Sequence, residues 1–204
     1  MSTPPKSRRA EYAEATRSGI VDAARRLFAE QGYFATTVNE IAEAARVAPT
    51  TVYAVTGGKQ GLIRTLVDVW SDAPIVAETA ARQASTTDPD EILRQSAASV
   101  RSMRESYGDI IRVVLATAPQ DTTVAEGLRV ATQRYRAAIT RLATRLSEVG
   151  GLHPDMTVPD AADTLWFYFG YAGYSTLVDD NGWSYDRAER WLVEQARTAL
   201  RNGG

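Results

Sequence analysis

The segment from Thr37 to Gly58 constrains the fold more tightly than any other part of the chain. Thr37 and Glu40 have the spacing of a capping box, in which each side chain bonds a backbone N–H of the other residue at the start of a helix. Pro49 suits the first position of a second helix, because that position needs no backbone N–H. Gly57 and Gly58 then end this helix. The segment therefore predicts two short helices joined by the turn Arg-Val-Ala.

The sequence around this segment also has the apolar spacing of helices. Ile20, Ala24, Leu27 and Phe28 form a stripe that predicts a helix from about Ser18 to Gly32. No stretch alternates apolar and polar residues long enough to predict a strand. We therefore expect an all-α chain of about nine helices. The remaining helices are expected from Lys59 to about Ala84 and at 89–106, 108–118, 121–149, 159–178 and 184–201.

We expect three regions along the chain: a flexible basic arm at 1–15, a three-helix helix-turn-helix domain at 16–64 and a larger helical domain at 65–204. Residues 1–64 hold nine Lys/Arg and six Asp/Glu, a balance of +3, whereas the remainder has a balance of −5. A basic front on an acidic body favours contact between the front and a polyanion.

The composition argues against several other classes of protein. The chain has no cysteine and a single histidine, His153, and it has no Gly-x-Ser-x-Gly motif. We therefore expect no enzyme, no metal site and no cofactor. The N-terminus is polar, and the most apolar stretch, 165–178, is too short to span a bilayer. These features predict a cytoplasmic protein with no membrane partner.

A helix-turn-helix places one helix in the major groove, where the side chains near its N-terminal end reach base edges. That helix needs one apolar face toward its support and small or polar groups facing outward. We expect Val47 and Val52 to face inward. The residues expected to face outward are Pro49, Thr50, Thr51 and Ala54.

Phosphates beside the groove need hydrogen-bond donors and positive charge. Thr36 and Thr37 stand at a predicted helix N-terminus, which attracts anions. Tyr53 offers a hydroxyl group, and Lys59 offers a compact charge. Each has a simpler alternative: Thr37 as a cap only, Tyr53 as a packing residue and Lys59 as a solvated surface lysine.

Taken as a set, the residues from Ile20 to Ile63 resemble the N-terminal DNA-binding domain of the TetR (tetracycline-repressor-like) family of transcriptional regulators. The resemblance implies a homodimer that binds a palindromic double-stranded DNA operator, with a C-terminal domain that dimerises and binds a small-molecule effector. It places Thr37, Tyr53 and Lys59 at phosphate-contacting positions, and Pro49, Thr50, Thr51 and Ala54 on the recognition helix. The matching elements are Ala-Ala-x-x-Leu-Phe with Gly32-Tyr33, Thr36-Thr37-Val38, Ile41-Ala42, Thr51-Val52-Tyr53, Lys59 and Leu62.

Two places depart from the family pattern. Arg46 stands where the family's turn usually has glycine, which questions the left-handed turn geometry and adds a charge near the DNA backbone. Ala54-Val55-Thr56 replaces the common Tyr-His-Phe. The base-reading surface is therefore smaller and more apolar, which is consistent with contacts to thymine methyl groups.

Aromatic residues are concentrated in the second part of the chain, where they predict either core packing or a pocket between helices. The predicted ligand-pocket residues are Trp70, Met103, Tyr107, Ile111, Leu115, Trp166 and Phe169. Arg104, Arg112 and Gln133 are candidate polar partners, although a surface position is favoured for each. Since the resemblance implies a four-helix bundle from two subunits, we place the dimer interface on the last two helices, at Tyr171, Tyr174, Leu177, Trp191, Leu192 and Ala199.

The sequence thus predicts a sequence-specific DNA-binding regulator, in particular a repressor that leaves its operator when a small hydrophobic or aromatic ligand binds. Two alternatives remain open. One is a DNA-binding regulator without a small-molecule effector, and the other is a ligand-binding helical dimer with weak DNA specificity.

Overall fold

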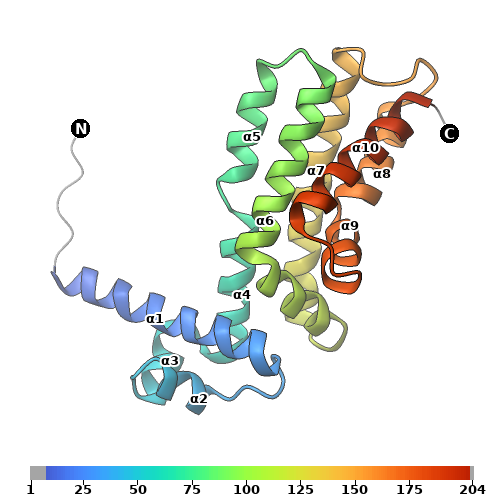
Figure 1. The fold of residues 1–204 in the computed structure, drawn as a ribbon. Helices are drawn as coiled ribbons and strands as arrows, with labels where there is room; N and C mark the ends of the chain where they lie inside the picture. Colours follow the sequence, from blue (N-terminus) through green and yellow to red (C-terminus); the bar gives the residue numbers. More distant parts are fainter. Residues whose placement is uncertain (1–7, 203–204) are drawn as a thin grey trace. The chain divides into compact units, whose positions relative to one another are not determined.

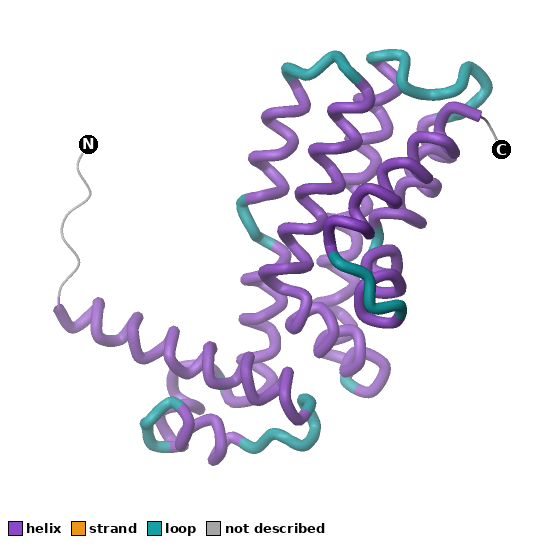
Figure 2. Tube along the Cα trace, viewed as in Figure 1, coloured by secondary structure: helices purple, strands orange, loops and turns teal. Residues whose placement is uncertain are grey.

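The computed structural model describes residues 8–202, and every regular element in that range is helical (Figures 1 and 2). The all-α prediction is confirmed. No helix in the described range is both long and apolar enough to cross a membrane.

The chain divides into two compact units. The N-terminal unit is Met1–Asp72 with Asp109–Ala131, and the C-terminal unit is Ala73–Gly108 with Thr132–Gly204. This division does not coincide with the domain boundary predicted after residue 64. The reason is that α4 (Gly58–Ser71) runs further, and parts of α6 (Pro89–Thr117) and α7 (Thr122–Glu148) also belong to the N-terminal unit.

The N-terminal unit begins with α1 (Arg8–Gln31), followed by α2 (Val38–Ala44), α3 (Pro49–Thr56) and α4. Because α1 starts at Arg8, the prediction of a flexible arm is wrong for residues 8–15, and residues 1–7 lie outside the described range. The residues at 8–15 include Arg, Ala and Glu, which are strong helix formers. The fully buried side chains that hold these helices together include Ile20, Phe28, Ile41, Val52, Leu62 and Leu66.

Three predicted helix boundaries are wrong. The helix expected from Lys59 to Ala84 is two helices, α4 and α5 (Ile75–Ala84), because Pro74 interrupts the backbone pattern between them. The helices expected at 89–106 and 108–118 form the continuous α6, since an interior glycine such as Gly108 costs only about 1 kcal/mol. The helix expected at 159–178 ends as α8 (Val158–Phe169) before Gly170, where a Cβ atom would lie 2.4 Å from the Trp166 carbonyl oxygen.

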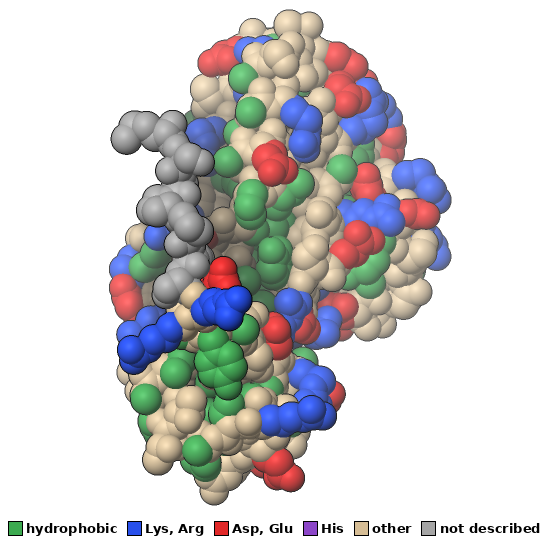
Figure 3. Space-filling view, turned by 90° about the vertical axis from the view of Figure 1, so that its left-hand side faces the viewer, with side chains coloured by type: hydrophobic (Ala, Val, Ile, Leu, Met, Phe, Trp, Pro, Cys, Tyr) green, Lys and Arg blue, Asp and Glu red, His purple; other side chains and the backbone are tan. Residues whose placement is uncertain are grey.

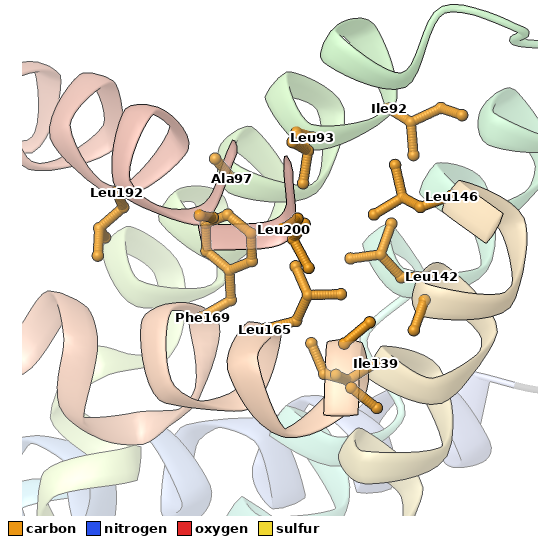
Figure 4. Close-up of a cluster of buried hydrophobic side chains, with 14 of the residues drawn as sticks. Ile92, Leu93, Ala97, Ile139, Leu142, Leu146, Leu165, Phe169, Leu192 and Leu200 are labelled. Carbon is orange, nitrogen blue, oxygen red and sulfur yellow. The ribbon is translucent and has the colours of Figure 1, made fainter. Parts of the chain in front are cut away.

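After Gly170 the chain forms a short α9 (Tyr171–Tyr174), the π-helical η2 (Ser175–Asp180) and finally α10 (Tyr185–Asn202). The 3₁₀ turn η1 (Ala118–Gln120) joins α6 to α7. The predicted bounds of α7 and α10 are confirmed to within a residue or two. In the core of the C-terminal unit, apolar side chains of α6, α7, α8 and α10 point toward one another (Figure 4). Its labelled members are Ile92, Leu93, Ala97, Ile139, Leu142, Leu146, Leu165, Phe169, Leu192 and Leu200.

Candidate nucleic-acid interface

The start of α2 is closed by the predicted capping box, which the structure confirms. The Glu40 backbone N–H donates to Thr37 Oγ1 at 3.2 Å, and Glu40 Oε2 accepts from both the backbone N–H and the hydroxyl of Thr37, each at 2.7 Å. These hydrogen bonds from Thr37 lower the pKa of the Glu40 carboxyl group. The Thr37 hydroxyl is thus already engaged as a cap, and Glu40 adds a negative charge at this N-terminus.

The turn between α2 and α3 is left-handed although it contains no glycine. Arg46 has φ 57°, the only positive φ of a non-glycine residue in the described range. Its N–H donates to the Glu43 carbonyl at 3.0 Å and the Val47 N–H donates to the Ala42 carbonyl at 2.9 Å, which is the pattern of a Schellman motif. The family's turn geometry is therefore kept, and the exposed Arg46 side chain accommodates it at a backbone cost of about 1–2 kcal/mol.

Helix α3 has one buried face and one exposed face. Pro49 occupies its first position as predicted, and the Val52 side chain is 0% exposed among α1, α2 and α4, which α3 contacts. Thr51 is half-buried and Val47, in the turn, is partly buried. The residues exposed on the opposite face are Pro49, Thr50, Tyr53 and Ala54.

Tyr53 is both exposed and packed. The side chain is 60% exposed, yet its ring lies so close to Gly58 that a Cβ atom there would stand 2.9 Å from Tyr53 Cε1. Gly58 itself has φ 77°, a conformation that other residues rarely adopt. The ring is therefore supported from beneath while its hydroxyl stays at the surface.

Lys59 is held in place rather than loosely solvated. Its Nζ lies 4.5 Å from the centroid of the Tyr33 ring and 3.5 Å from the Phe34 carbonyl oxygen. Partial burial lowers the pKa of the Lys59 amino group, and the nearby Glu40 carboxylate opposes this shift. The structure thus fixes this charge beside the loop that leads into α2.

Thr36 does not suit a phosphate contact. It is 1% exposed, and both its hydroxyl (2.8 Å) and its backbone N–H (3.3 Å) donate to the Gly32 carbonyl oxygen. The hydroxyl also accepts from Gln31 Nε2 at 3.3 Å. Thr36 therefore closes the C-terminal end of α1, and we correct its assignment to the DNA-contacting set.

Sequence reasoning missed two residues that position α3. Arg17 Nη1 donates to the Val55 carbonyl at 2.9 Å and Nη2 lies 3.5 Å from Thr65 Oγ1, so Arg17 ties α1 to α3 and α4. The spacing of Arg17 from Ile20 and Ala24 could have indicated this, because the three share a helix face. Gly61 is the other residue: a Cβ atom there would lie 1.5 Å from the Thr56 carbonyl oxygen.

A half-buried ion pair ties α1 to the part of α6 that belongs to the N-terminal unit. Arg25 Nε and Nη2 donate to the two carboxylate oxygens of Asp109 at 2.6 Å and 2.7 Å. Burial raises the pKa of Asp109, but the hydrogen bonds and charge of Arg25 outweigh it and lower the pKa overall. This bidentate pair stabilises α1, the helix that α3 packs against.

The surface of the N-terminal unit mixes positive and apolar groups. In the lower part of Figure 3, Lys and Arg side chains lie on either side of exposed hydrophobic side chains. Exposed apolar groups in this unit include Tyr12, Phe34 and Tyr53. Such a surface offers charge for phosphates together with apolar contacts for base edges.

The predicted pocket residues are divided between the two units. In the C-terminal unit Phe169 belongs to the buried core and Trp166 packs against it, whereas Met103 and Tyr107 are half-buried. In the N-terminal unit Trp70 and Ile111 are buried and Leu115 is half-buried. Of the suggested polar partners, Arg112 and Gln133 are exposed as expected, but Arg104 is 6% exposed.

The residues assigned to the dimer interface also divide into two groups. Tyr174, Leu177 and Leu192 lie in the core of the C-terminal unit, so the assignment of their side chains to a subunit interface is corrected. Trp191 is 40% exposed, and Tyr171 and Ala199 are half-buried. Phe167 on α8 is 73% exposed and was assigned to neither the pocket nor the interface, because the sequence does not show which face of an apolar run is exposed.

The comparisons with known proteins agree with the geometry of the N-terminal unit. Residues 20–66 match the family of bacterial regulatory proteins named tetR, so the resemblance to the TetR family is confirmed. No curated protein sequence matches the chain.

Solved structures of similar fold cover nearly the whole chain. The fatty acid degradation regulator FadR from Bacillus halodurans is 18% identical, with a TM-score of 0.73 over 97% of this chain and 98% of that chain. SmeT, in a complex with triclosan, is 20% identical, with a TM-score of 0.73 over 93% of both chains. FadR from Bacillus subtilis, in complex with stearoyl-CoA, is 15% identical, with a TM-score of 0.72 over 90% of this chain and 99% of that chain. The chain thus has the fold of these transcriptional regulators.

Proposed function

We propose that this protein is a homodimeric regulator that binds a palindromic DNA operator by inserting α3 into the major groove. One observation carries this proposal: the left-handed turn at Arg46 seats Val52 in the core and leaves Pro49, Thr50, Tyr53 and Ala54 exposed on one short helix. A helix anchored in this way can approach base edges without unfolding its support.

The exposed groups differ in what they can recognise. The Thr50 hydroxyl can donate to or accept from a base edge, and the Ala54 methyl group suits the methyl of thymine. Lys59, Arg46 and the Tyr53 hydroxyl offer donors to phosphates on either side of the groove. Thr37 contributes by capping the start of α2.

We further propose that the regulator is a repressor released by a ligand bound in the C-terminal unit. The exposed Phe167 and Trp191 side chains on α8 and α10 support association of two subunits through this region. Release requires a ligand that binds better to a state in which the two recognition helices no longer match successive major grooves. SmeT with triclosan and FadR with stearoyl-CoA are precedents in the fold for a bound ligand.

The test is selection of bound sequences from random double-stranded DNA with the full-length protein. We expect enrichment of one palindrome with two half-sites. Thr50→Ala should then reduce the preference for this palindrome over random DNA by about tenfold. The matched control Thr144→Ala, on the exposed side of α7, should bind like the wild type. An unenriched pool would contradict the proposal and favour a helical dimer with weak DNA specificity.

A further inference from the structure

Two arginines one turn apart on α6 have very different environments. Arg101 is 30% exposed and its guanidinium pairs with three carboxylates, those of Glu105, Asp186 and Glu189. Arg104 is only 6% exposed, and Nη2 donates to Asp179 Oδ2 at 2.8 Å. Arg104 Nε is buried and has no hydrogen-bond partner within residues 8–202. Arg104 is thus more deeply buried than Arg101, yet its guanidinium makes fewer ion pairs with the described residues.

The free donor of Arg104 is one half of a carboxylate-binding edge. Nε and Nη2 lie on the same side of a guanidinium and together bind both oxygens of one carboxylate. Arg25 forms this complete arrangement with Asp109 in the N-terminal unit. On Arg104 the Nη2 group donates to Asp179, whereas Nε has no hydrogen-bond partner in the described part of the chain. A buried charged donor without a partner is rare in native proteins and points to a role other than stability.

Asp179 is held on a backbone segment of unusual geometry. It lies in η2, a six-residue π-helix, and its Oδ2 also accepts from Ser175 Oγ at 3.1 Å. Short π-helical turns are uncommon and occur frequently at functional sites. Tyr174 and Leu177 anchor the start and middle of this region in the core, whereas Asp179 is close to its end. The carboxylate that pairs with Arg104 therefore lies at the C-terminal end of the π-helix η2.

The charge of Arg104 also acts on one ring of an aromatic cluster in the same unit. Burial raises the pKa of the Tyr135 hydroxyl, and the Arg104 guanidinium opposes this shift. Tyr135, Trp166 and Tyr171 are in mutual contact, with ring centroids 5.3 Å, 5.7 Å and 5.5 Å apart. The Tyr135 hydroxyl donates to the Phe169 carbonyl, and the Tyr171 hydroxyl is bonded to Thr132 at 3.1 Å. With both hydroxyl groups engaged, this aromatic cluster presents mainly apolar surface.

We propose that Arg104 is the anchor for the carboxylate of an amphipathic ligand whose apolar body packs against Tyr135, Trp166 and Tyr171. The ligand carboxylate occupies both Nε and Nη2 and takes the place of Asp179. Binding thereby releases the end of η2. This inference rests on the proposed ligand-responsive function and specifies the chemical class of the ligand as an apolar carboxylate.

The experiment measures binding to full-length protein, without DNA, by titration calorimetry. The probes are 2-naphthoate, indole-3-acetate, octanoate and decanoate, each paired with its own uncharged primary amide. We expect at least one carboxylate to bind about tenfold more tightly than its amide, because only the carboxylate makes charge-assisted hydrogen bonds to Arg104. No binding of any carboxylate at millimolar concentration, or equal binding of every acid and amide, would overturn the proposal.

Variants assign the preference to Arg104. Arg104→Met should abolish the tighter binding of a carboxylate than of its amide. The double variant Arg104→Met/Asp179→Asn tests the same point without retaining the Asp179 charge that Arg104 neutralises. Asp179→Asn alone should raise the affinity for the carboxylate, since the internal competitor is lost. Arg101→Gln, the same loss of charge one turn away, should leave the preference unchanged. A preference that survives Arg104→Met would place the anchor elsewhere.

Operator binding is measured separately with the same variants, so the two proposals can fail independently. If the selected DNA is bound but no carboxylate preference exists, the assignment of Arg104 is wrong and the regulator function stands. If the preference exists but no DNA sequence is enriched, the ligand site stands and the DNA-binding function is wrong.

Discussion

The two units of this chain satisfy their polar groups in different ways. In the N-terminal unit, hydrogen bonds fix α2 and α3: the capping box at Thr37, the Schellman turn at Arg46 and the Arg17 bond to the end of α3. In the C-terminal unit long helices surround a well-packed core, yet Arg104 Nε and Gln95 Oε1 are buried without hydrogen-bond partners in the described range. A rigid surface suits the reading of a regular duplex, whereas incompletely satisfied interior groups suit a change on ligand binding.

Among the substitutions considered for the N-terminal unit, Gly61→Ala should destabilise it most. The new Cβ atom would meet the Thr56 carbonyl oxygen at 1.5 Å, so α3 and α4 would have to separate. We expect the free energy of unfolding to fall by about 3 kcal/mol or more, together with a loss of DNA affinity. Denaturant unfolding measures this. Gly19→Ala is the control: nothing lies within 4 Å of its Cβ, and it should stabilise α1 by about 0.5–1 kcal/mol.

The next largest effect concerns the bidentate pair of Arg25 and Asp109. Because folding lowers the pKa of Asp109, the pair contributes stability above the carboxyl's unfolded pKa, and this contribution is lost as the pH falls through the folded pKa. We expect Asp109→Asn to destabilise the protein by about 2 kcal/mol at pH 7 and to flatten the loss of stability below about pH 4. Unfolding curves at several pH values check this. The exposed pair of Glu126 with Arg129 is the comparison, and Glu126→Gln should change stability at pH 7 less.

Lys59→Ala separates phosphate contact from base reading. We expect affinity for all DNA sequences to fall by about tenfold and the salt dependence of binding to flatten by the equivalent of about one phosphate contact. Mobility shifts at several salt concentrations measure both. An unchanged salt slope would remove Lys59 from the phosphate-contacting set. Arg64→Ala, at an exposed position on the same helix, controls for the loss of one positive charge.

Arg46→Gly should have a small effect, because it changes only the turn between α2 and α3. Glycine removes the left-handed strain, although it adds freedom to the unfolded chain, so we expect a net stabilisation of about 0.5 kcal/mol. The variant should bind DNA more weakly if the Arg46 charge contacts the backbone. Thermal unfolding together with mobility shifts tests the two effects in one protein. A destabilised variant would mean that the Arg46 side chain, and not its φ angle, holds the turn.

The same contrast explains how much the sequence could predict. The bounds of α2 and α3 followed from signals at most four residues apart, namely Thr37 with Glu40, Pro49, and the glycines after Thr56. Pro74 and Gly170 carried equally local signals, but each stands within a longer apolar pattern that favoured one continuous helix. In these two places the break in the backbone outweighed the periodicity of the side chains.

Two residues, Thr36 and Arg104, have environments that the sequence did not predict. Thr36 is adjacent to Thr37 in sequence, yet its hydroxyl turns back to Gly32, which only the path of the chain after α1 determines. The buried Arg104 pairs with Asp179, which lies on a π-helix that no sequence pattern indicated. Contacts that depend on how the chain turns and packs could therefore not be predicted from residue spacing, whereas the exposure of Pro49, Thr50 and Ala54 on α3 could, although Thr51 is half-buried.

The contact between Tyr53 and Gly58 has a consequence for the thermodynamics of DNA binding. Because the ring rests on a position that has no Cβ atom, its side-chain rotation is restricted before any duplex is present. Part of the conformational entropy that a tyrosine loses on binding is then already lost during folding, which leaves more of the contact energy for the complex. In the proposed complex, Gly58 would in this way strengthen the contact that Tyr53 makes with DNA.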